Sequence, residues 1–313
     1  MNIFESSRLC AELIENISRA FIGKTDVVKN AVLALISGGN ILLEDVPGVG
    51  KTLLAKSIAK SIHGSLKRIQ FTADLLPTDV TGVTMFYQHK GEFEFRKGPI
   101  FSNILLADEI NRATPRTQSS LLEAMEEGQV TVDGTLYMLD RPFFVIATQN
   151  PIELEGTYML PFSQMDRFIT RLKIGYLDLA MEKEMLKEQK LTMPIEFLKT
   201  IIDCDTLVKI QDSVRHIKIS EELYEYIVAI IHKSRNFEKI EYGASPRGTL
   251  DLMRFSQAHA FLASREYILP DDIKKAAPIV LGHRIILKKG ARLSTASNSD
   301  VVYEIIESIP VPV

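Results

Sequence analysis

A short segment near residue 50 constrains the fold of this chain more than any other. Residues 41–43 are the apolar run Ile-Leu-Leu, and residues 44–52 read EDVPGVGKT. A buried strand that leads into a glycine loop and then into Lys51-Thr52 matches the pattern G-x-x-x-x-G-K-[ST], except at its first position. The glycines let backbone N–H groups face phosphate oxygens, the lysine reaches the β- and γ-phosphates, and the hydroxyl ligates Mg²⁺. The segment therefore predicts a strand, a phosphate-binding loop and a helix.

The irregular position in this loop is Asp45, which replaces the first glycine. Aspartate tolerates left-handed backbone angles and can stabilise a turn through its own side chain. Further on, Leu54, Ile58 and Ile62 recur at helical spacing, and Gly64 is a natural stop. A helix that starts at the loop points its N–H groups and its positive dipole end at the phosphates. A plain turn would not need Lys-Thr after the glycine, so we predict a nucleotide site.

The composition is that of a globular protein with room for two domains. The chain has 313 residues, 46% of them hydrophobic and 25% charged, and a net charge of −3 that gives no general attraction to nucleic acid. Cys10 and Cys204 lie far apart and lack metal-ligand spacing, so neither a disulfide framework nor a zinc site is indicated. Charges interrupt the apolar residues at the N-terminus, and no apolar run approaches the ~18–20 residues of a membrane helix. We expect a cytoplasmic protein without membrane insertion.

Up to about residue 176 the sequence alternates short apolar strands with helices, which is typical of a parallel sheet covered on both faces. One helix is well marked, because Thr114 can cap it, Pro115 suits its first position and Gly128 can end it. Asp133-Gly134, within residues 129–139, predicts a β-hairpin. The expected strands are Ile41–Leu43, Arg68–Phe71, Ile104–Ala107, Phe143–Thr148 and Arg171–Ile174.

From about residue 180 onward we expect the strands to disappear and a small helical domain to begin. The boundary is placed in the charged stretch around Met181–Lys190 or slightly before it, which gives domains of 1–178 and 179–313. The expected helices are Asp205–Val214, Glu221–Ser234, Pro246–Ser264 and Asp271–Leu281.

Two polar sites follow predicted strands. Asp108 and Glu109 end the apolar run 104–107, and strand neighbours face opposite sides, so the two acids should have different tasks. Asp108 would hold Mg²⁺ and Glu109 would polarise the attacking water. Asn150 follows the strand at 143–148, where a polar amide can orient that water. An exposed acidic strand end and an Asn-Pro turn are the alternatives, but the phosphate loop upstream favours the functional interpretation.

Together these elements resemble the MoxR family of AAA+ ATPases. The resemblance rests on LLEDVPGVGKT at 42–52, GPIF at 98–101, LLADEINRATPRTQSSLLEAMEEGQVTVDG at 105–134, ATQNP at 147–151, LPFSQMDRF at 160–168 and GASPR at 243–247. It covers nearly the whole chain, and the block at 105–134 is the most specific part. It implies an α/β fold with an AAA+ αβα core built on a parallel sheet, plus a C-terminal all-helical lid domain.

The resemblance also implies a role for each matching residue. Lys51 and Thr52 match the Walker A pair, and Asp108 and Glu109 match Walker B. Asn150 is similar to sensor 1, Arg167 to the arginine finger that acts on a neighbouring subunit's nucleotide, and Arg247 to the lid arginine called sensor 2. Residues implied in cofactor binding are Ile22, Gly23, Pro47, Gly48, Val49, Gly50, Lys51, Thr52 and Leu53, and those implied for the metal are Thr52 and Asp108. ATP and Mg²⁺ are the expected cofactors.

An arginine that acts in trans requires head-to-tail contacts, which close into a ring when the rotation permits. The family implies a hexamer that remodels or matures partner proteins, with a von Willebrand factor A-domain protein as partner. The alternatives are a nucleic-acid-associated motor, which the acidic chain disfavours, and a nucleotide-gated scaffold with little turnover. Arg112, Arg116 and Arg171 remain rival candidates for the finger. Residues 70–82 and 129–139 resemble two family insertions that face a pore or a partner.

Overall fold

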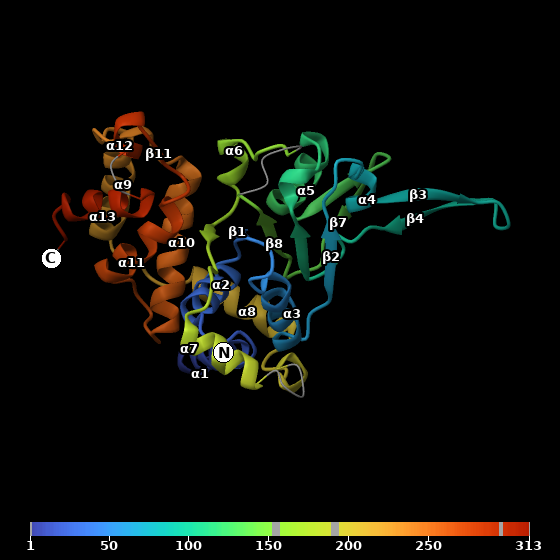
Figure 1. The fold of residues 1–313 in the computed structure, drawn as a ribbon, viewed down its shortest axis with the longest axis horizontal. Helices are drawn as coiled ribbons and strands as arrows, with labels where there is room; N and C mark the ends of the chain where they lie inside the picture. Colours follow the sequence, from blue (N-terminus) through green and yellow to red (C-terminus); the bar gives the residue numbers. More distant parts are fainter. Residues whose placement is uncertain (1, 152–156, 189–193, 294–296, 313) are drawn as a thin grey trace.

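The structure is a computed structural model that describes residues 2–151, 157–188, 194–293 and 297–312. Its centre is a parallel sheet whose strands run in the order β2-β5-β8-β1-β9 (Figure 1). Since all five strands point the same way, their carboxyl ends share one edge of the sheet. The strands are β1 (Ile41–Glu44), β2 (Leu66–Gln70), β5 (Ile104–Asp108), β8 (Phe144–Gln149) and β9 (Thr170–Leu172). All five predicted strands are confirmed, with ends shifted by one or two residues.

The central strands are apolar without a break because both faces of the sheet are covered. Ile41 and Leu43 of β1 belong to one hydrophobic core, whereas Leu42 between them belongs to a second core on the opposite face. Strand β5 shows the same alternation, with Leu105 and Leu106 in different cores. The first core also contains side chains of α1 (Ile3–Ala20), α2 (Thr25–Ile36) and α3 (Lys51–Ser61), and the second contains side chains of α5 (Pro115–Glu127).

The marked helix α5 forms as predicted, with one correction. Pro115 occupies its first turn, and Gly128 ends it in a left-handed conformation at φ 64°. Thr114 stands at the N-cap, but its side chain accepts no capping hydrogen bond from the first-turn N–H groups; its hydroxyl lies 3.2 Å from that of Thr117. Helix α3 ends at Ser61, before the predicted stop at Gly64.

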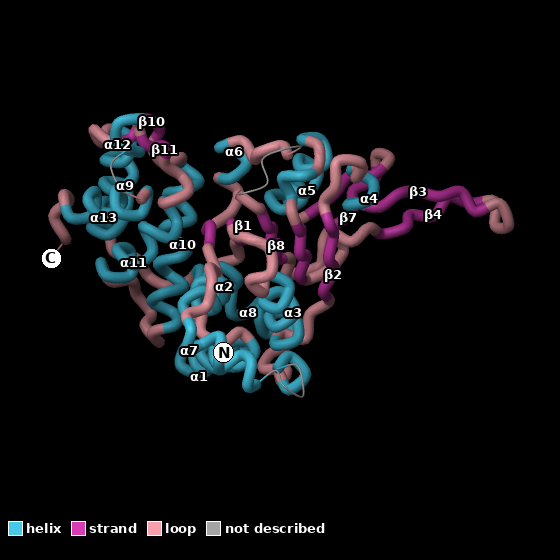
Figure 2. Tube along the Cα trace, viewed as in Figure 1, coloured by secondary structure: helices cyan, strands magenta, loops and turns pink. Residues whose placement is uncertain are grey.

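Two hairpins leave the sheet. The predicted one consists of β6 (Gln129–Val132) and β7 (Thr135–Met138), joined by two left-handed residues at 133 and 134. The second was not predicted: β3 (Gly82–Tyr87) and β4 (Glu92–Lys97) project from the body of the protein on the right of Figure 1 and as the long magenta ribbon in Figure 2. It follows the short helix α4 (Pro77–Thr81) in the 70–82 region. The alternating EFEFRK sequence and Gly91 were the available signals.

The C-terminal part is largely helical, and the predicted helices are confirmed. Its helices from residue 221 onward lie on the left of Figure 1, whereas the helix at Cys204–Arg215 lies near α2 and α3 at the centre. The expectation that strands disappear after residue 180 is wrong in one detail, because β10 (Ile240–Tyr242) pairs antiparallel with β11 (Ile286–Leu287). Strands this short carry little signal. The helices are α8 (Cys204–Arg215), α9 (Glu221–Arg235), α10 (Pro246–Leu262), α11 (Pro270–Leu281), α12 (Lys289–Leu293) and α13 (Asn298–Glu307).

Short helices lie in the connections between these elements. They are a 3-10 helix at Ile110–Arg112 between β5 and α5, α6 (Phe162–Met165) between β8 and β9, and a 3-10 helix at Pro194–Phe197 before α8. Helix α7 (Leu179–Glu188) lies in the predicted boundary stretch, whose last two residues, 189 and 190, are outside the described ranges. The division at residue 178 stays a prediction. Across the described ranges, no helix combines the length and apolar character needed to cross a membrane.

Candidate nucleotide-binding site

The loop between β1 and α3 has the backbone of a phosphate cradle. Gly48 and Gly50 are left-handed at φ 86° and 98°, a conformation that residues other than glycine rarely adopt. A Cβ on Gly48 would meet no atom within 4 Å, whereas one on Gly50 would lie 3.0 Å from the ring of Phe21. Gly50 is the N-cap of α3 and has no side chain to cap the helix. The first-turn N–H groups and the positive dipole end are therefore available to an anion.

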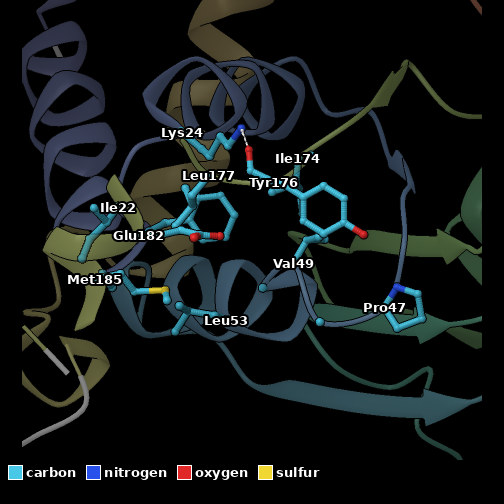
Figure 3. A pocket seen from close by; sticks show the side chains of 15 residues that line it. Ile22, Lys24, Pro47, Val49, Leu53, Ile174, Tyr176, Leu177, Glu182 and Met185 are labelled. Atoms are coloured by element: carbon cyan, nitrogen blue, oxygen red, sulfur yellow. Dashed lines mark hydrogen bonds between the residues drawn. The ribbon is translucent and has the colours of Figure 1, made fainter. Parts of the chain in front are cut away.

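A cavity of about 450 Å³ adjoins this loop (Figure 3). Of the residues predicted to bind nucleotide, Ile22, Pro47, Gly48, Val49, Gly50 and Leu53 line it. Gly23 is not among the lining residues; a Cβ there would be 3.0 Å from the side chain of Met181 and 3.1 Å from that of Leu177. The apolar side and the loop backbone fit an aromatic base next to a polyphosphate. Sequence reasoning missed several lining residues, namely Lys24, Ile174, Gly175, Tyr176, Leu177, Glu182 and Met185.

Lys51 is held at the mouth of the loop by a carbonyl. Its ammonium group donates a hydrogen bond to the main-chain oxygen of Asp45. Burial lowers the pKa of Lys51, while the carboxylates of Asp45, Asp108 and Glu109 act in the opposite direction. The two predicted Walker B acids, Asp108 at the end of β5 and Glu109 directly after it, are therefore close enough to the lysine to influence its pKa. A nucleotide phosphate would provide the buried ammonium with a stronger partner.

Asp108, at the end of β5, has both carboxylate oxygens engaged. Arg68 of β2 donates to Oδ2 at 2.7 and 3.2 Å, and Thr148 of β8 donates to Oδ1 at 2.6 Å. A cation bound here would compete with the guanidinium. Thr52, the second residue of α3, supplies a hydroxyl. These donors fit Mg²⁺, which keeps several waters and takes few protein ligands beside the phosphates; in the described ranges no three His, Cys, Asp or Glu form a metal cluster.

Glu109 lies beyond the strand, in a left-handed conformation with φ 55° and ψ 50°. Asp108 and Glu109 have different hydrogen-bond partners. The left-handed turn at Glu109 accounts for this difference, and not the alternation of side chains along a strand. Gln70 donates to Glu109 Oε2 at 2.8 Å, and Arg112 donates to the same oxygen at 2.9 Å. The backbone N–H of Glu109 donates to the Thr148 hydroxyl at 2.8 Å. Glu109 is thus held by neighbours that sequence reasoning did not identify.

Asn150 is buried directly after β8, and β8 lies next to β5, which ends at Asp108 just before Glu109. This places the predicted water-orienting amide at the same sheet edge as the two acids. Its predicted role stays a prediction.

Two predicted arginines meet at one acid on α5. Arg167 forms an ion pair with Glu126 at 3.2 Å and donates to the carbonyl of Leu122 at 2.8 Å. Arg247, in the first turn of α10, pairs with the other oxygen of Glu126. Neither arginine belongs to the described lining of the 450 Å³ cavity. The structure therefore brings Arg167 and Arg247 together, away from that cavity.

The rival arginines have other positions. Arg112 pairs with Glu109 at 2.9 Å, and Arg171 pairs with Glu44 at 3.2 Å. Arg116 is exposed in the first turn of α5. Only Arg167 and Arg247, of the five, share Glu126.

The loop that carries Arg167 is anchored to the helical part by the buried Arg284. This guanidinium is 1% exposed and donates to Asp166 Oδ1 at 2.8 Å and to Asp251 Oδ2 at 2.5 Å. It also donates to the carbonyls of Asp166 and Phe168. Ser245, the N-cap of α10, donates to Asp166 Oδ2 at 2.7 Å. No sequence motif marks Arg284, because its partners lie far away in the chain.

A parallel sheet in this order, a phosphate loop after β1, an acid pair after β5 and a helical lid define an AAA+ protein. The model for the ATPase family associated with various cellular activities (AAA) matches residues 40–170, and the AAA lid domain model matches 232–305. The chain belongs to the MoxR family of AAA+ ATPases.

Relatives cover almost the entire chain. The uncharacterized protein YeaC of Bacillus subtilis is 47% identical over 97% of this chain and 95% of its own. Chaperone MoxR1 of Mycobacterium tuberculosis is 35% identical over 96% of this chain and 81% of its own. The crystal structure of a candidate ATPase from Cytophaga hutchinsonii superposes with a TM-score of 0.91 at 38% identity, and covers 99% of this chain and 97% of that one.

Proposed function

We propose that this protein binds ATP with Mg²⁺ and hydrolyses it in a homo-oligomeric ring, a hexamer, that remodels or matures partner proteins in the cytoplasm. The observation that carries the proposal is the meeting of Arg167 and Arg247 on Glu126, outside the lining of the chain's own cavity. Charges placed in this way serve a nucleotide on an adjacent subunit, and head-to-tail repetition of that contact builds a ring.

Within one subunit, the glycine loop and the α3 N-terminus hold the phosphates, and Lys51 exchanges the Asp45 carbonyl for phosphate oxygens. Thr52 and Asp108 would hold Mg²⁺, which neutralises charge on the β- and γ-phosphates when bound. Glu109 accepts the proton of the attacking water, and Asn150 orients that water. For Oε2 of Glu109 to take this proton, it must be released from Gln70 and Arg112, which donate to it at 2.8 and 2.9 Å.

The trans arginines provide the remaining stabilisation of the transition state. An arginine finger contributes roughly 10³–10⁵ in rate. In the present arrangement Glu126 neutralises both Arg167 and Arg247, so their charges become available only when a neighbour's phosphates compete for them. Hydrolysis is therefore expected to depend on assembly, while ATP binding is a property of each subunit.

Two observations support the proposal of a partner protein: one relative is named Chaperone MoxR1, and the chain has an exposed apolar surface. Phe86 and Phe93 on the β3–β4 hairpin are 52% and 73% exposed, with ring centroids 5.0 Å apart. Exposed aromatic residues on a projecting element are typical of a protein-binding surface. By family resemblance we propose a von Willebrand factor A-domain protein as the partner.

The test is complementation between two inactive variants. Glu109→Gln removes the base but keeps the arginines, whereas Arg167→Ala keeps the base but removes the finger. Each variant alone is expected to bind ATP and to hydrolyse almost none. An equimolar mixture should recover about a quarter of wild-type hydrolysis, because random assembly places an intact finger beside an intact base at one interface in four.

Arg19→Ala is the control, since it removes an exposed arginine whose ion pair, with Glu15, lies within α1, and its hydrolysis should equal that of wild type. A mixture that stays inactive would move the finger to another residue or back to its own subunit. Strong stimulation by single-stranded or duplex DNA would instead favour a nucleic-acid motor, and negligible wild-type hydrolysis at high protein concentration would favour a scaffold. Affinity capture with ATP-loaded Glu109→Gln then tests the partner.

A further inference from the structure

Asp45 contacts both sides of the nucleotide cavity without lining it. Its Oδ2 accepts hydrogen bonds from the backbone N–H groups of Ile174 and Gly175, each at 2.6 Å. Its Oδ1 accepts from the N–H of Val46 at 2.9 Å, and its carbonyl accepts from Lys51. The residue is 8% exposed. One buried side chain therefore joins the phosphate loop to a segment that follows β9.

This role differs from the one predicted for Asp45. A left-handed backbone was expected to explain its place in the loop, but Asp45 is not among the left-handed residues in the described ranges, so that explanation is wrong. The turn-stabilising bond to Val46 is present, yet the bonds to Ile174 and Gly175 reach almost 130 residues along the chain. Glycine, the usual residue at this position, could make none of these side-chain bonds.

The segment 174–177 forms one wall of the cavity (Figure 3). It lies beyond β9, which ends at Leu172, so sheet pairing no longer holds it. Gly175 is left-handed at φ 66°. Besides the Asp45 carboxylate, its tether is Lys24, whose ammonium donates to the carbonyl of Tyr176 at 2.8 Å. Besides the packing of Ile174 in the hydrophobic core, two charged side chains therefore fix the position of this wall relative to the phosphate loop.

We propose that Asp45 is a positioning residue that sets the base-binding wall at residues 174–177 against the phosphate loop, and thereby determines affinity and selectivity for the base. The inference rests on the proposed ATP site. Hydrogen bonds to an ionised acceptor are short and strong, and two of them converge on one oxygen here. Without the carboxylate, two N–H groups at the edge of the cavity lose their acceptor and the wall can move away from the base.

The experiment compares ligands that do or do not carry a base. Calorimetric titration in Mg²⁺ measures the affinity of ATP, GTP and inorganic tripolyphosphate for wild type, Asp45→Gly and Asp45→Asn. Asp45→Gly completes the G-x-x-x-x-G-K-[ST] pattern, yet we expect it to weaken ATP binding by about tenfold or more. The ratio of the affinity for ATP to the affinity for GTP should decrease. The affinity for tripolyphosphate should stay within about twofold of wild type, since the loop glycines and Lys51 remain. Asp45→Asn retains an acceptor oxygen and should lie between.

Asp203→Gly is the matched control, because it removes a carboxylate that accepts a hydrogen bond within its own capping turn, from the N–H of Thr206 at 2.8 Å. It should leave all three affinities unchanged. An equal loss for ATP and tripolyphosphate would mean that Asp45 only shapes the phosphate loop, and unchanged ATP binding would remove any role; both results overturn the inference. If Asp45→Gly fails to fold, Asp45→Asn carries the same comparison. Absence of ATP binding by wild type would instead overturn the proposed function.

Discussion

Replacing Arg284 by methionine tests whether the loop of the proposed finger depends on the helical domain. The guanidinium is almost fully buried and bonds to carboxylates from two parts of the chain, Asp166 before β9 and Asp251 on α10. Methionine fills a similar volume but donates nothing. The substitution removes the guanidinium from the carboxylates of Asp166 and Asp251, of which Asp251 is buried, and leaves the carbonyls of Asp166 and Phe168 without this donor. Arg254 remains 3.9 Å from the Asp251 carboxylate.

The expected cost follows from this geometry. Removing one member of a buried ion pair destabilises a protein by about 3–5 kcal/mol, because the remaining charge is buried without compensation. For a protein of this size, each kcal/mol lowers the melting temperature by about 2–4 °C, so Arg284→Met should lower it by roughly 6–20 °C. Asp251→Asn in the same background should recover part of this loss, since it neutralises one of the two carboxylates that lose Arg284.

The assay is urea denaturation and thermal melting of wild type, both single variants and the double variant. Hydrolysis in the assembled state should fall at temperatures where Arg284→Met is still folded, because the segment 166–168 that carries Arg167 loses its link through Arg284 to Asp251 of α10 and is left with the hydrogen bond from Ser245 to Asp166. ATP binding should persist. A destabilisation below about 1 kcal/mol, or full hydrolytic activity, would refute the claim that Arg284 links the finger loop to the helical domain.

Two further predictions concern single side chains. Gln70→Ala removes the 2.8 Å hydrogen bond to Glu109 and should raise basal hydrolysis about fivefold, corresponding to ~1 kcal/mol; a steady-state ATPase assay that shows a decrease would contradict the view that Gln70 restrains the base. Burial lowers the pKa of His259 from 6.5 to about 4, so its stabilising contribution is complete above pH 6.5 and is lost as the pH falls toward 4. At pH 5 the loss of unfolding free energy amounts to about 2 kcal/mol. Urea unfolding of wild type and His259→Gln at pH 7 and 5 should show a smaller change in unfolding free energy with pH in the variant.

Much of the core was predictable because its signals are local. Each strand of the parallel sheet is a short apolar run, since both of its faces are buried, and the glycine loop needs particular residues at adjacent positions. The β6–β7 hairpin was predictable for the same reason, because Asp133-Gly134 suits its two left-handed turn positions. The projecting β3–β4 hairpin was missed, since its strands lie largely in solvent and lack a buried face.

The neighbours of the predicted catalytic residues could not be predicted, because they come from distant parts of the chain. Gln70 reaches Glu109 only because β2 lies beside β5, and Thr148 reaches Asp108 only because β8 lies on the other side of β5. Spacing along the chain does not encode strand order. The shared contact of Arg167 and Arg247 with Glu126 likewise depends on how the helical domain packs against α5.

By itself, the sequence determined the class of protein, the parallel sheet and the candidate residues for phosphate, metal and water, since these depend on residue type and short-range spacing. Only the tertiary structure decided which of these residues meet and what restrains them. Asp45 shows the difference most clearly: in the sequence it is an irregular loop residue, and in the folded chain its carboxylate binds the wall at Ile174 and Gly175. The physical reason is that hydrogen bonds and ion pairs act over a few ångströms in space, whatever the separation in sequence.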